Sequence, residues 1–217
     1  VTFLAHQAWT MLDAVGRTEF LGYDSEDVEG QVLAILKDGQ RASEAVSGET
    51  VRVLTNQTPF YAESGGQAGD RGKMTSANKF WGEVIDTEKK LGAMHVHVVK
   101  VIEGILHMGD AVDLKVDGER RRATRANHSA THLLHAALKH ALGGHVSQKG
   151  SLVSAERLRF DFSHPKPVTA EELAWVEAEV NAVIRQNTDT ATRLMPTDQA
   201  VAAGAEALFG EKYGDEV

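Results

Sequence analysis

The segment MHVHVVKVI, residues 94–102, belongs to a series of short β-like runs that fill residues 21–116. Related runs are EGQVLAIL, ETVRVLT, KFWGEVIDTE and AVDLKVD, and glycine or other turn residues separate them. Regularly spaced short strands are typical of a small antiparallel barrel or sandwich. Within MHVHVVKVI, His95 and His97 share one strand face, and we interpret them as solvent-facing residues rather than metal ligands.

Helical signals dominate from Arg120 onward. Apolar residues at helical spacing predict a helix over residues 126–142, which two glycines then end. The stretch SLVSAERLRFDFSH, residues 151–164, alternates in the manner of a strand pair. A further strand is expected at residues 188–195 and a short helix at residues 197–209. The chain is therefore predicted to be α+β, with a small antiparallel β-barrel followed by an α+β part.

The sequence TAEE places Thr169 three residues before Glu172, which is the spacing of a capping box. It predicts the start of a second helix that frays near Asn187. The apolar face expected for this helix comprises Leu173, Val176, Val180 and Val183. We divide the chain into a helical lead-in (1–19), a β-barrel domain (20–118) and an α+β domain (119–217).

Composition limits the classes of protein to consider. The 217 residues are 42% hydrophobic and include no cysteine, so the chain can bury a sizeable core without disulfides or thiolate ligands. This fits a reducing compartment, and we expect a cytoplasmic protein. No apolar run approaches the roughly 20 residues that span a bilayer, so no membrane partner is expected.

The net charge of −8 hides an uneven distribution. Residues 115–166 contain ten Lys or Arg and only four Asp or Glu, whereas the rest of the chain is strongly acidic. The basic residues surround the predicted helix at 126–142. Two interpretations are equally weighted: an ordinary solvated surface, or a site that faces a polyanion.

The stretch NHSATHLLH, residues 127–135, places His128 and His132 four residues apart on one helix. Such residues lie on the same side of the helix, where charged imidazoles would repel each other. A bound metal, or a reaction centre that needs neutral imidazole, would resolve this conflict. An isolated pair of this kind is more often two half-buried polar residues, so neighbouring motifs must decide.

Two glycine-containing stretches favour the interpretation that His128 and His132 belong to a functional site. PFYAESGGQAGDRG, residues 59–72, holds Gly65 and Gly66, which permit close backbone approach, and Gln67, whose amide both donates and accepts hydrogen bonds. A plain hairpin turn is the alternative. GGHVSQKGSLV, residues 143–153, places Gln148 and Lys149 in a glycine-bounded loop directly after the histidine helix.

Together with NHSATHLLHAAL, RFDFSH and ALFGEKYGDEV, these stretches make the chain resemble the alanyl-tRNA synthetases from about residue 17 to its end. The resemblance implies a part of an enzyme that attaches alanine to tRNA(Ala) with ATP. The matching part holds the editing domain, an α+β module of the threonyl/alanyl-tRNA synthetase type that follows a β-barrel. In this family it hydrolyses tRNA(Ala) mischarged with serine or glycine.

The resemblance also implies roles for individual residues. His128 and His132 would supply two of four zinc ligands, and the other two would come from a Cys-x-x-x-His motif expected beyond Val217. The zinc would orient the substrate amino group or activate water. Thr131 and Gln148 fall at positions associated with catalysis and with recognition of the small polar substrate. The implied substrate-binding residues are Gly65, Gly66, Gln67, Arg125 and Lys149.

The implied partners are the acceptor end of tRNA(Ala) and the remainder of the synthetase chain. Two alternatives stay open. The chain could position tRNA without catalysis, by contacting phosphates through Arg120–Arg122, Arg125 and Lys149, or it could be a free-standing tRNA editing hydrolase. An unrelated metallohydrolase is disfavoured because the sequence lacks H-E-x-x-H and an evident third ligand.

Overall fold

The computed structural model describes residues 15–189, 191–205 and 214–217. The chain forms two compact units, one made of residues 1–128 and 152–157 and the other of residues 129–151 and 158–217. Most of the lead-in predicted at residues 1–19, and most of the stretch ALFGEKYGDEV, lie outside the described residues. No helix in the described part of the chain is long and apolar enough to cross a bilayer.

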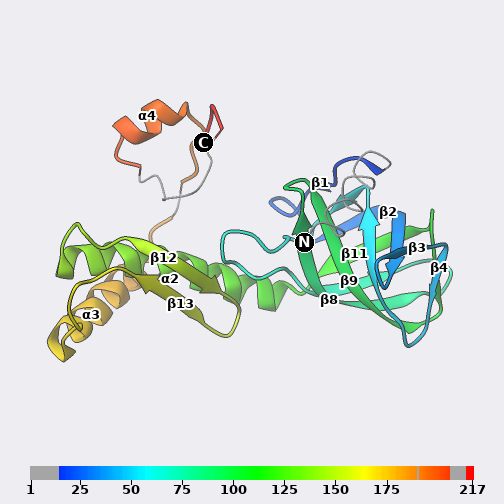
Figure 1. The fold of residues 1–217 in the computed structure, drawn as a ribbon, viewed down its shortest axis with the longest axis horizontal. Coiled ribbons are helices and arrows are strands. Elements are labelled where there is room, and N and C mark those ends of the chain that lie inside the picture. Colours follow the sequence, from blue (N-terminus) through cyan, green and yellow to red (C-terminus); the bar gives the residue numbers. More distant parts are fainter. Residues whose placement is uncertain (1–14, 190, 206–213) are drawn as a thin grey trace. The chain divides into compact units, whose positions relative to one another are not determined.

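The first unit is built around a closed antiparallel barrel (Figure 1). Each of its six strands pairs with the next, and β11 closes the circle by pairing with β2. In the order of the sheet, the strands are β2 (Asp27–Lys37), β5 (Thr50–Thr55), β9 (Met94–Glu103), β8 (Trp81–Lys90), β7 (Gly72–Thr75) and β11 (Ala111–Val116). The predicted barrel and the α+β fold class are confirmed.

Short strands extend the barrel at its edges. β3 (Gln40–Ala42) pairs with the end of β2, and β4 (Glu44–Val46) pairs with β10 (Ile105–His107). β1 (Glu19–Phe20) runs parallel to β6 (Gln57–Thr58) and so brings the start of the described chain beside the loop that follows β6. The barrel is filled by aliphatic and aromatic side chains, among them Ile35, Val53, Phe60, Met74, Phe80, Val99 and Leu114.

His95 and His97 correct one sequence interpretation, because both side chains are buried rather than solvent-facing. They do share one face of β9, but that face points into the barrel. His97 Nδ1 lies 3.1 Å from the carbonyl oxygen of Val53, and its Nε2 lies 2.7 Å from Thr58 Oγ1. Complete burial lowers the pKa of His97 from its ordinary value to about 4, so the ring is neutral at neutral pH.

The barrel should therefore lose stability in mild acid. Unfolded His97 takes up a proton near pH 6.5, whereas the folded ring resists protonation down to about pH 4, so stability is full above pH 6.5 and falls between these values. We expect a loss of roughly 2 kcal/mol between about pH 7.5 and pH 5. Urea unfolding of wild type and His97→Gln at both pH values measures this loss. The variant should have a lower free energy of unfolding than wild type at pH 7.5, but that free energy should change less with pH. An identical pH dependence would contradict the assignment.

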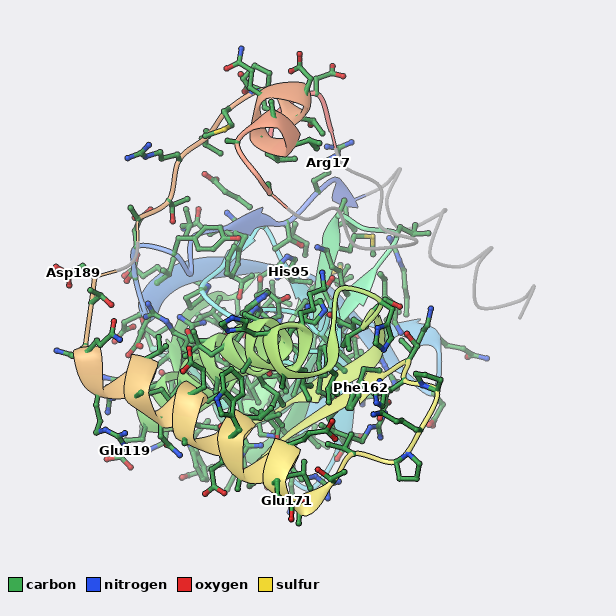
Figure 2. The ribbon with its side chains drawn as sticks, turned by 90° about the vertical axis from the view of Figure 1, so that its left-hand side faces the viewer. Arg17, His95, Glu119, Phe162, Glu171 and Asp189 are labelled. Atoms are coloured by element: carbon green, nitrogen blue, oxygen red, sulfur yellow. The ribbon has the colours of Figure 1, made fainter. Side chains whose placement is uncertain are left out.

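The second unit combines helices with a two-stranded sheet. The long helix α2 (Gly118–Leu142) contributes its C-terminal half, and β12 (Gln148–Val153) pairs with β13 (Leu158–Phe162). Helix α3 (Ala170–Gln186) begins near the labelled Glu171 in Figure 2, and α4 (Thr197–Ala202) follows. The core of this unit is formed by Leu134, Ala137, Leu138, Val146, Phe160, Phe162, Val176 and Val180.

Several local predictions for this unit are confirmed. The capping box is present, since Thr169 Oγ1 accepts from the backbone of Glu172 and the Glu172 side chain accepts from the backbone of Thr169. The strand pair is also present, with Phe160 and Phe162 on its covered face. One predicted core position is wrong, because the side chain of Leu173 is 54% exposed.

Two element boundaries also differ from prediction. Helix α2 begins at Gly118 rather than at residue 126, and the carboxylate of Asp117 accepts a hydrogen bond from the backbone of Arg120 at this end. The basic run that opens the helix has no apolar periodicity, so the sequence pattern does not reveal it. No strand forms over the described residues of 188–195, whose side chains are largely exposed. At the end of this stretch Met195 exchanges two backbone hydrogen bonds with Val217, next to an isolated bridge between Pro196 and Glu216.

Candidate functional site

The glycine-rich loop at residues 59–71 connects β6 with β7 in the first unit. Gly65 and Gly66 have φ angles of 59° and 84°, a region that residues with a Cβ atom rarely adopt. Around them, the backbones of Ser64 and Gln67 exchange hydrogen bonds of 3.0 and 3.3 Å. The glycines therefore make a tight turn that presents the Gln67 side chain.

The segment at residues 152–157 holds this loop in place. The backbone N–H of Ala68 donates to the carbonyl of Val153 at 2.9 Å, and the N–H of Val153 donates to the carbonyl of Gly66 at 2.8 Å. The same segment binds α2, because the side-chain amide of Asn127 donates to the carbonyl of Ser154 at 2.8 Å. The loop and the first half of α2 are thus fixed to one common segment.

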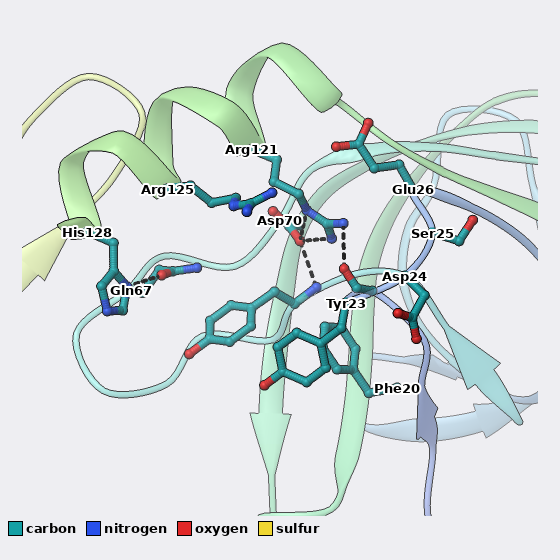
Figure 3. Close-up of a pocket in the computed structure, with 12 residues that line it drawn as sticks. Phe20, Tyr23, Asp24, Ser25, Glu26, Gln67, Asp70, Arg121, Arg125 and His128 are labelled. Atoms are coloured by element: carbon teal, nitrogen blue, oxygen red, sulfur yellow. Dashed lines mark hydrogen bonds and ion pairs between the residues drawn. The ribbon is translucent and has the colours of Figure 1, made fainter. Parts of the chain in front are cut away.

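These hydrogen bonds place Gln67 of the loop beside His128 of α2, although the two residues are 61 positions apart in the sequence. His128 Nδ1 lies 2.5 Å from Gln67 Oε1 (Figure 3). An amide oxygen only accepts hydrogen bonds, so His128 donates from Nδ1, and a neutral ring then carries its lone pair on Nε2. A histidine that binds a metal is commonly oriented in this way by a partner at its other nitrogen.

Arg121 lies at the centre of the same unit and is almost fully buried. Its guanidinium binds the carboxylate of Asp70, the carbonyl of Pro59 and the carbonyl of Gly22. The carboxylate of Asp70 also accepts from the backbone N–H of Tyr61 at 2.7 Å. Arg121 is therefore a structural residue, and its predicted contact with RNA phosphates is wrong.

The other basic residues of this helix differ in their surroundings. Arg120 pairs with Glu156 at 2.5 Å, and this hydrogen bond holds the pKa of the Glu156 carboxyl at about 2. Arg125 is exposed and lines a pocket, and no carboxylate in the described part of the chain pairs with it. Of the cationic residues predicted in this stretch, Arg121 and Arg125 line this pocket, and Arg125 is the exposed one of the two.

The pocket has a volume of about 580 Å³ and opens beside Gln67 and His128 (Figure 3). Its floor is the Asp70–Arg121 ion pair. One wall is aromatic and is formed by Phe20, Tyr23 and Tyr61. Neither this wall nor the ion pair was predicted from the sequence, although the carboxylate of GDRG, residues 69–72, and the aromatic residues of FLGYDSE, residues 20–26, were available as signals.

The remaining predicted site residues lie in the second unit. Thr131 is buried on α2, whereas His132 is exposed on the same helix. Gln148 donates from its side-chain amide to Ser151 Oγ at 3.2 Å, and Lys149 is exposed on β12. His135, on the same helix, contacts the ring of Phe160, with 5.1 Å between the ring centroids.

The residues described fit only part of a zinc site. His128 and His132 lie four residues apart on α2, and the bond from His128 to Gln67 suits a metal ligand. Within residues 15–189, 191–205 and 214–217, no group of three or more His, Cys, Asp or Glu side chains is placed to hold a metal. A structural zinc site has four ligands, so these two histidines would form half of one.

A barrel joined to an α+β unit, with a glycine-rich loop set against a histidine helix, agrees with the comparison to known families. Residues 3–120 match the family model described as tRNA synthetases class II (A), and the chain belongs to this family. The resemblance to alanyl-tRNA synthetases is likewise confirmed. The chain is 62% identical, over 94% of its length, to the alanine–tRNA ligase of Parvibaculum lavamentivorans.

Two further relatives show the same relation. The alanine–tRNA ligases of Rhizorhabdus wittichii and Sphingopyxis alaskensis are each 60% identical to 93% of this chain. In all three cases the chain spans 23% of the relative's length. The similarity therefore concerns one part of a much longer enzyme.

Proposed function

We propose that this chain forms the part of an alanyl-tRNA synthetase that hydrolyses serine or glycine wrongly esterified to tRNA(Ala). The observation that carries the proposal is the hydrogen bond between Gln67 and His128, which both line one pocket. His128 belongs to the His-x-x-x-His motif on which the resemblance to this family rests. Hydrolysis adds water to the ester, and it releases the amino acid and a free hydroxyl of the terminal ribose. The rest of such an enzyme would attach alanine with ATP in the cytoplasm.

The side chains around the pocket mouth suit ester hydrolysis. His128 donates from Nδ1 to Gln67, which fixes the ring orientation and leaves Nε2 as the basic nitrogen of a neutral ring. Zinc held by His128 and His132 together with ligands from elsewhere would supply Lewis acidity. The tight turn at Gly65 and Gly66 admits close approach of a substrate to the backbone.

Positioning of tRNA without catalysis is the second candidate. It is favoured by Arg125, which is exposed on the pocket wall without a carboxylate partner in the described residues. Deacylation of Ser-tRNA(Ala) separates the two candidates, with correctly charged Ala-tRNA(Ala) as the control. Editing predicts rapid loss of serine and retention of alanine. Binding of both RNAs without faster release of either amino acid would support positioning alone.

A substitution at Thr131 tests how serine is recognised. Thr131→Val keeps the side-chain volume and removes the hydroxyl, so we expect hydrolysis of Ser-tRNA(Ala) to fall by about tenfold while Gly-tRNA(Ala) is cleared nearly as before. Gln148→Ala is the companion variant, and it should slow both reactions moderately. The measurement is a deacylation time course on both substrates. Equal losses in the Thr131 variant would identify this buried residue as a helix-packing residue.

A further inference from the structure

A second hollow in the first unit adjoins the pocket described above and shares Phe20, Tyr23 and Tyr61 with it. Neither Gln67 nor His128 lines this hollow, so the hydrolysis proposed above makes no use of it. Its volume is about 280 Å³, close to the lower limit of small-molecule sites, which is about 300 Å³. A ligand of this size is a small group, such as one sugar with its phosphate.

Three segments of the barrel unit form the walls of this hollow. Arg17 and Thr18 precede β1, Lys89 lies near the end of β8, and His95 lies near the start of β9; Figure 2 labels Arg17 and His95. The backbone N–H of Thr18 donates to the carbonyl of Ala93 at 3.1 Å, and the N–H of His95 donates to Thr18 Oγ1 at 3.2 Å. These hydrogen bonds hold the lining residues in fixed positions.

His95 supplies a hydrogen-bond acceptor to the hollow. Its side chain is 8% exposed, and Nδ1 lies 2.9 Å from the carbonyl oxygen of Phe60, so Nδ1 carries the hydrogen. Burial, together with the nearby charge of Lys89, lowers the pKa of His95, so the ring is neutral at neutral pH. The lone pair then lies on Nε2, which remains accessible and has no partner in the described part of the chain. Phe20 stacks on this ring at a centroid distance of 5.2 Å and fixes its orientation.

Arg17 and Thr18 supply hydrogen-bond donors on the opposite side of the polarity balance. Arg17 is exposed, and no carboxylate forms an ion pair with it among the described residues. Thr18 Oγ1 already accepts from the backbone of His95, so its O–H is left to donate, and no described residue accepts from it. A guanidinium beside a hydroxyl donor suits a phosphate group.

The acidic residues around the hollow do not line it. The carboxylates that are nearest in sequence or that line the adjoining hollows are Glu19, Asp24, Glu26, Glu63, Asp86 and Glu88. Lys89 shares one adjoining hollow with the last three of these, so its charge is partly offset there. Arg17 lines neither adjoining hollow. We therefore expect Arg17 to attract an anion more strongly than Lys89 does.

We propose that this hollow holds one ribose–phosphate unit of single-stranded RNA, with the phosphate bound by Arg17 and Thr18 and the 2′-hydroxyl donating to His95 Nε2. Only ribose has this hydroxyl, so the contact distinguishes RNA from DNA. The choice of RNA rests on the proposed function, since a free ribonucleotide presents the same chemistry. The unit bound here precedes the nucleotide that carries the ester, so Arg17, Thr18 and His95 are positioning residues.

The first test compares two labelled strands by fluorescence anisotropy with the whole chain. One is a short RNA that ends in CCA and carries no amino acid, and the other is a chimera with 2′-deoxy sugars at every position except the last. Because the terminal ribose is kept, the strands differ only upstream of it. The chimera should bind about 2- to 12-fold more weakly, the usual effect of one lost hydrogen bond. Equal binding would overturn the proposal.

His95→Phe connects this loss to the imidazole. Phenylalanine keeps a ring that can stack on Phe20 and removes both nitrogens, so the RNA and the chimera should bind the variant equally. Urea unfolding checks that the variant is folded, because the carbonyl of Phe60 also loses its donor. A folded variant that still prefers RNA as wild type does would overturn the 2′-hydroxyl contact. The comparison of the two strands on wild type does not depend on this variant.

Arg17→Ala tests the phosphate contact. It should reduce the slope of log affinity against log salt by about 0.7, the contribution of one phosphate in a single strand, and Lys89→Ala should reduce it by less. Lys100→Ala is the control, since Lys100 is exposed on β9 and lines none of the three hollows. An Arg17→Ala slope equal to that of wild type would overturn the phosphate contact.

Two further measurements separate the source of the ligand from the proposed function. Adenosine 5′-monophosphate that displaces the RNA at equal concentration, when its 2′-deoxy form does not, would overturn RNA as the source and leave a free ribonucleotide in the same contacts. Wild type that prefers RNA through His95 but does not hydrolyse Ser-tRNA(Ala) would refute the proposed function alone. Hydrolysis by a wild type that binds the RNA and the chimera equally would refute this site alone.

Discussion

Arg121→Leu is expected to lower the free energy of unfolding of the barrel unit by about 3–5 kcal/mol, because it leaves the carboxylate of Asp70 buried without its counter-charge. Both partners of this ion pair are less than a tenth exposed. The same change removes the donors to the carbonyls of Gly22 and Pro59, which connect the Tyr23 turn and the glycine-rich loop with α2. Urea unfolding monitored by circular dichroism gives the measurement.

Arg120→Leu is the matched control for this prediction. Arg120 precedes Arg121 on the same helix, but its partner Glu156 is largely exposed, so the loss of Arg120 should destabilise the unit far less than the loss of Arg121. The double variant Arg121→Leu with Asp70→Leu should recover part of the stability, since neither charge then stays buried and unpaired. Similar small losses for Arg120→Leu and Arg121→Leu would show that the buried pair does not stabilise the unit.

The different burial of Arg120 and Arg121 is a feature that sequence patterns do not predict. Neighbouring residues in one basic run differ in burial because helix geometry turns Arg121 toward the barrel, and its partner Asp70 is 51 positions away. No local period marks such a pair. The early start of α2 is concealed for the same reason, since the run that opens the helix is fixed by tertiary contacts rather than by an apolar face.

Sequence patterns predicted well the features that depend on neighbouring residues, namely strands and a helix start. The β-like runs, MHVHVVKVI among them, identified five of the six barrel strands but not the short strand β7, and the spacing of Thr169 and Glu172 identified the start of α3. Burial of His95 and His97 was not predictable in this way. Alternation places both on one face of β9, but only the closed barrel and the hydrogen bonds to Thr58 and Val53 decide that this face points inward.

The candidate site was partly predictable for a related reason. The motif spacing singled out Gln67 and His128 separately, but their contact depends on the way residues 152–157 bind both the loop and α2. The aromatic wall was missed because Phe20 and Tyr23 occupy a turn, where no periodicity distinguishes a binding residue from a surface residue. Such residues become recognisable only when the pocket that they line is known.

His128→Ala is expected to slow hydrolysis of Ser-tRNA(Ala) by about 10²- to 10⁴-fold, the range that a positioned acid–base or ligand residue contributes. Gln67→Ala should cost about 10- to 100-fold, because it removes the acceptor that orients the imidazole without removing the imidazole itself. Gln67→Glu keeps an oxygen acceptor for Nδ1 and should retain more activity than Gln67→Ala. Rates come from single-turnover deacylation, and zinc content is measured on the same samples.

The comparison of single and double variants makes this prediction specific. If Gln67 acts through His128, then Gln67→Ala should add little to the loss caused by His128→Ala, because residues that act as a unit are not additive. His140→Ala is the control, since His140 is an exposed histidine on the same helix that contacts Trp175. Fully additive losses would separate Gln67 from His128, and an unchanged rate in His128→Ala would remove this histidine from the reaction altogether.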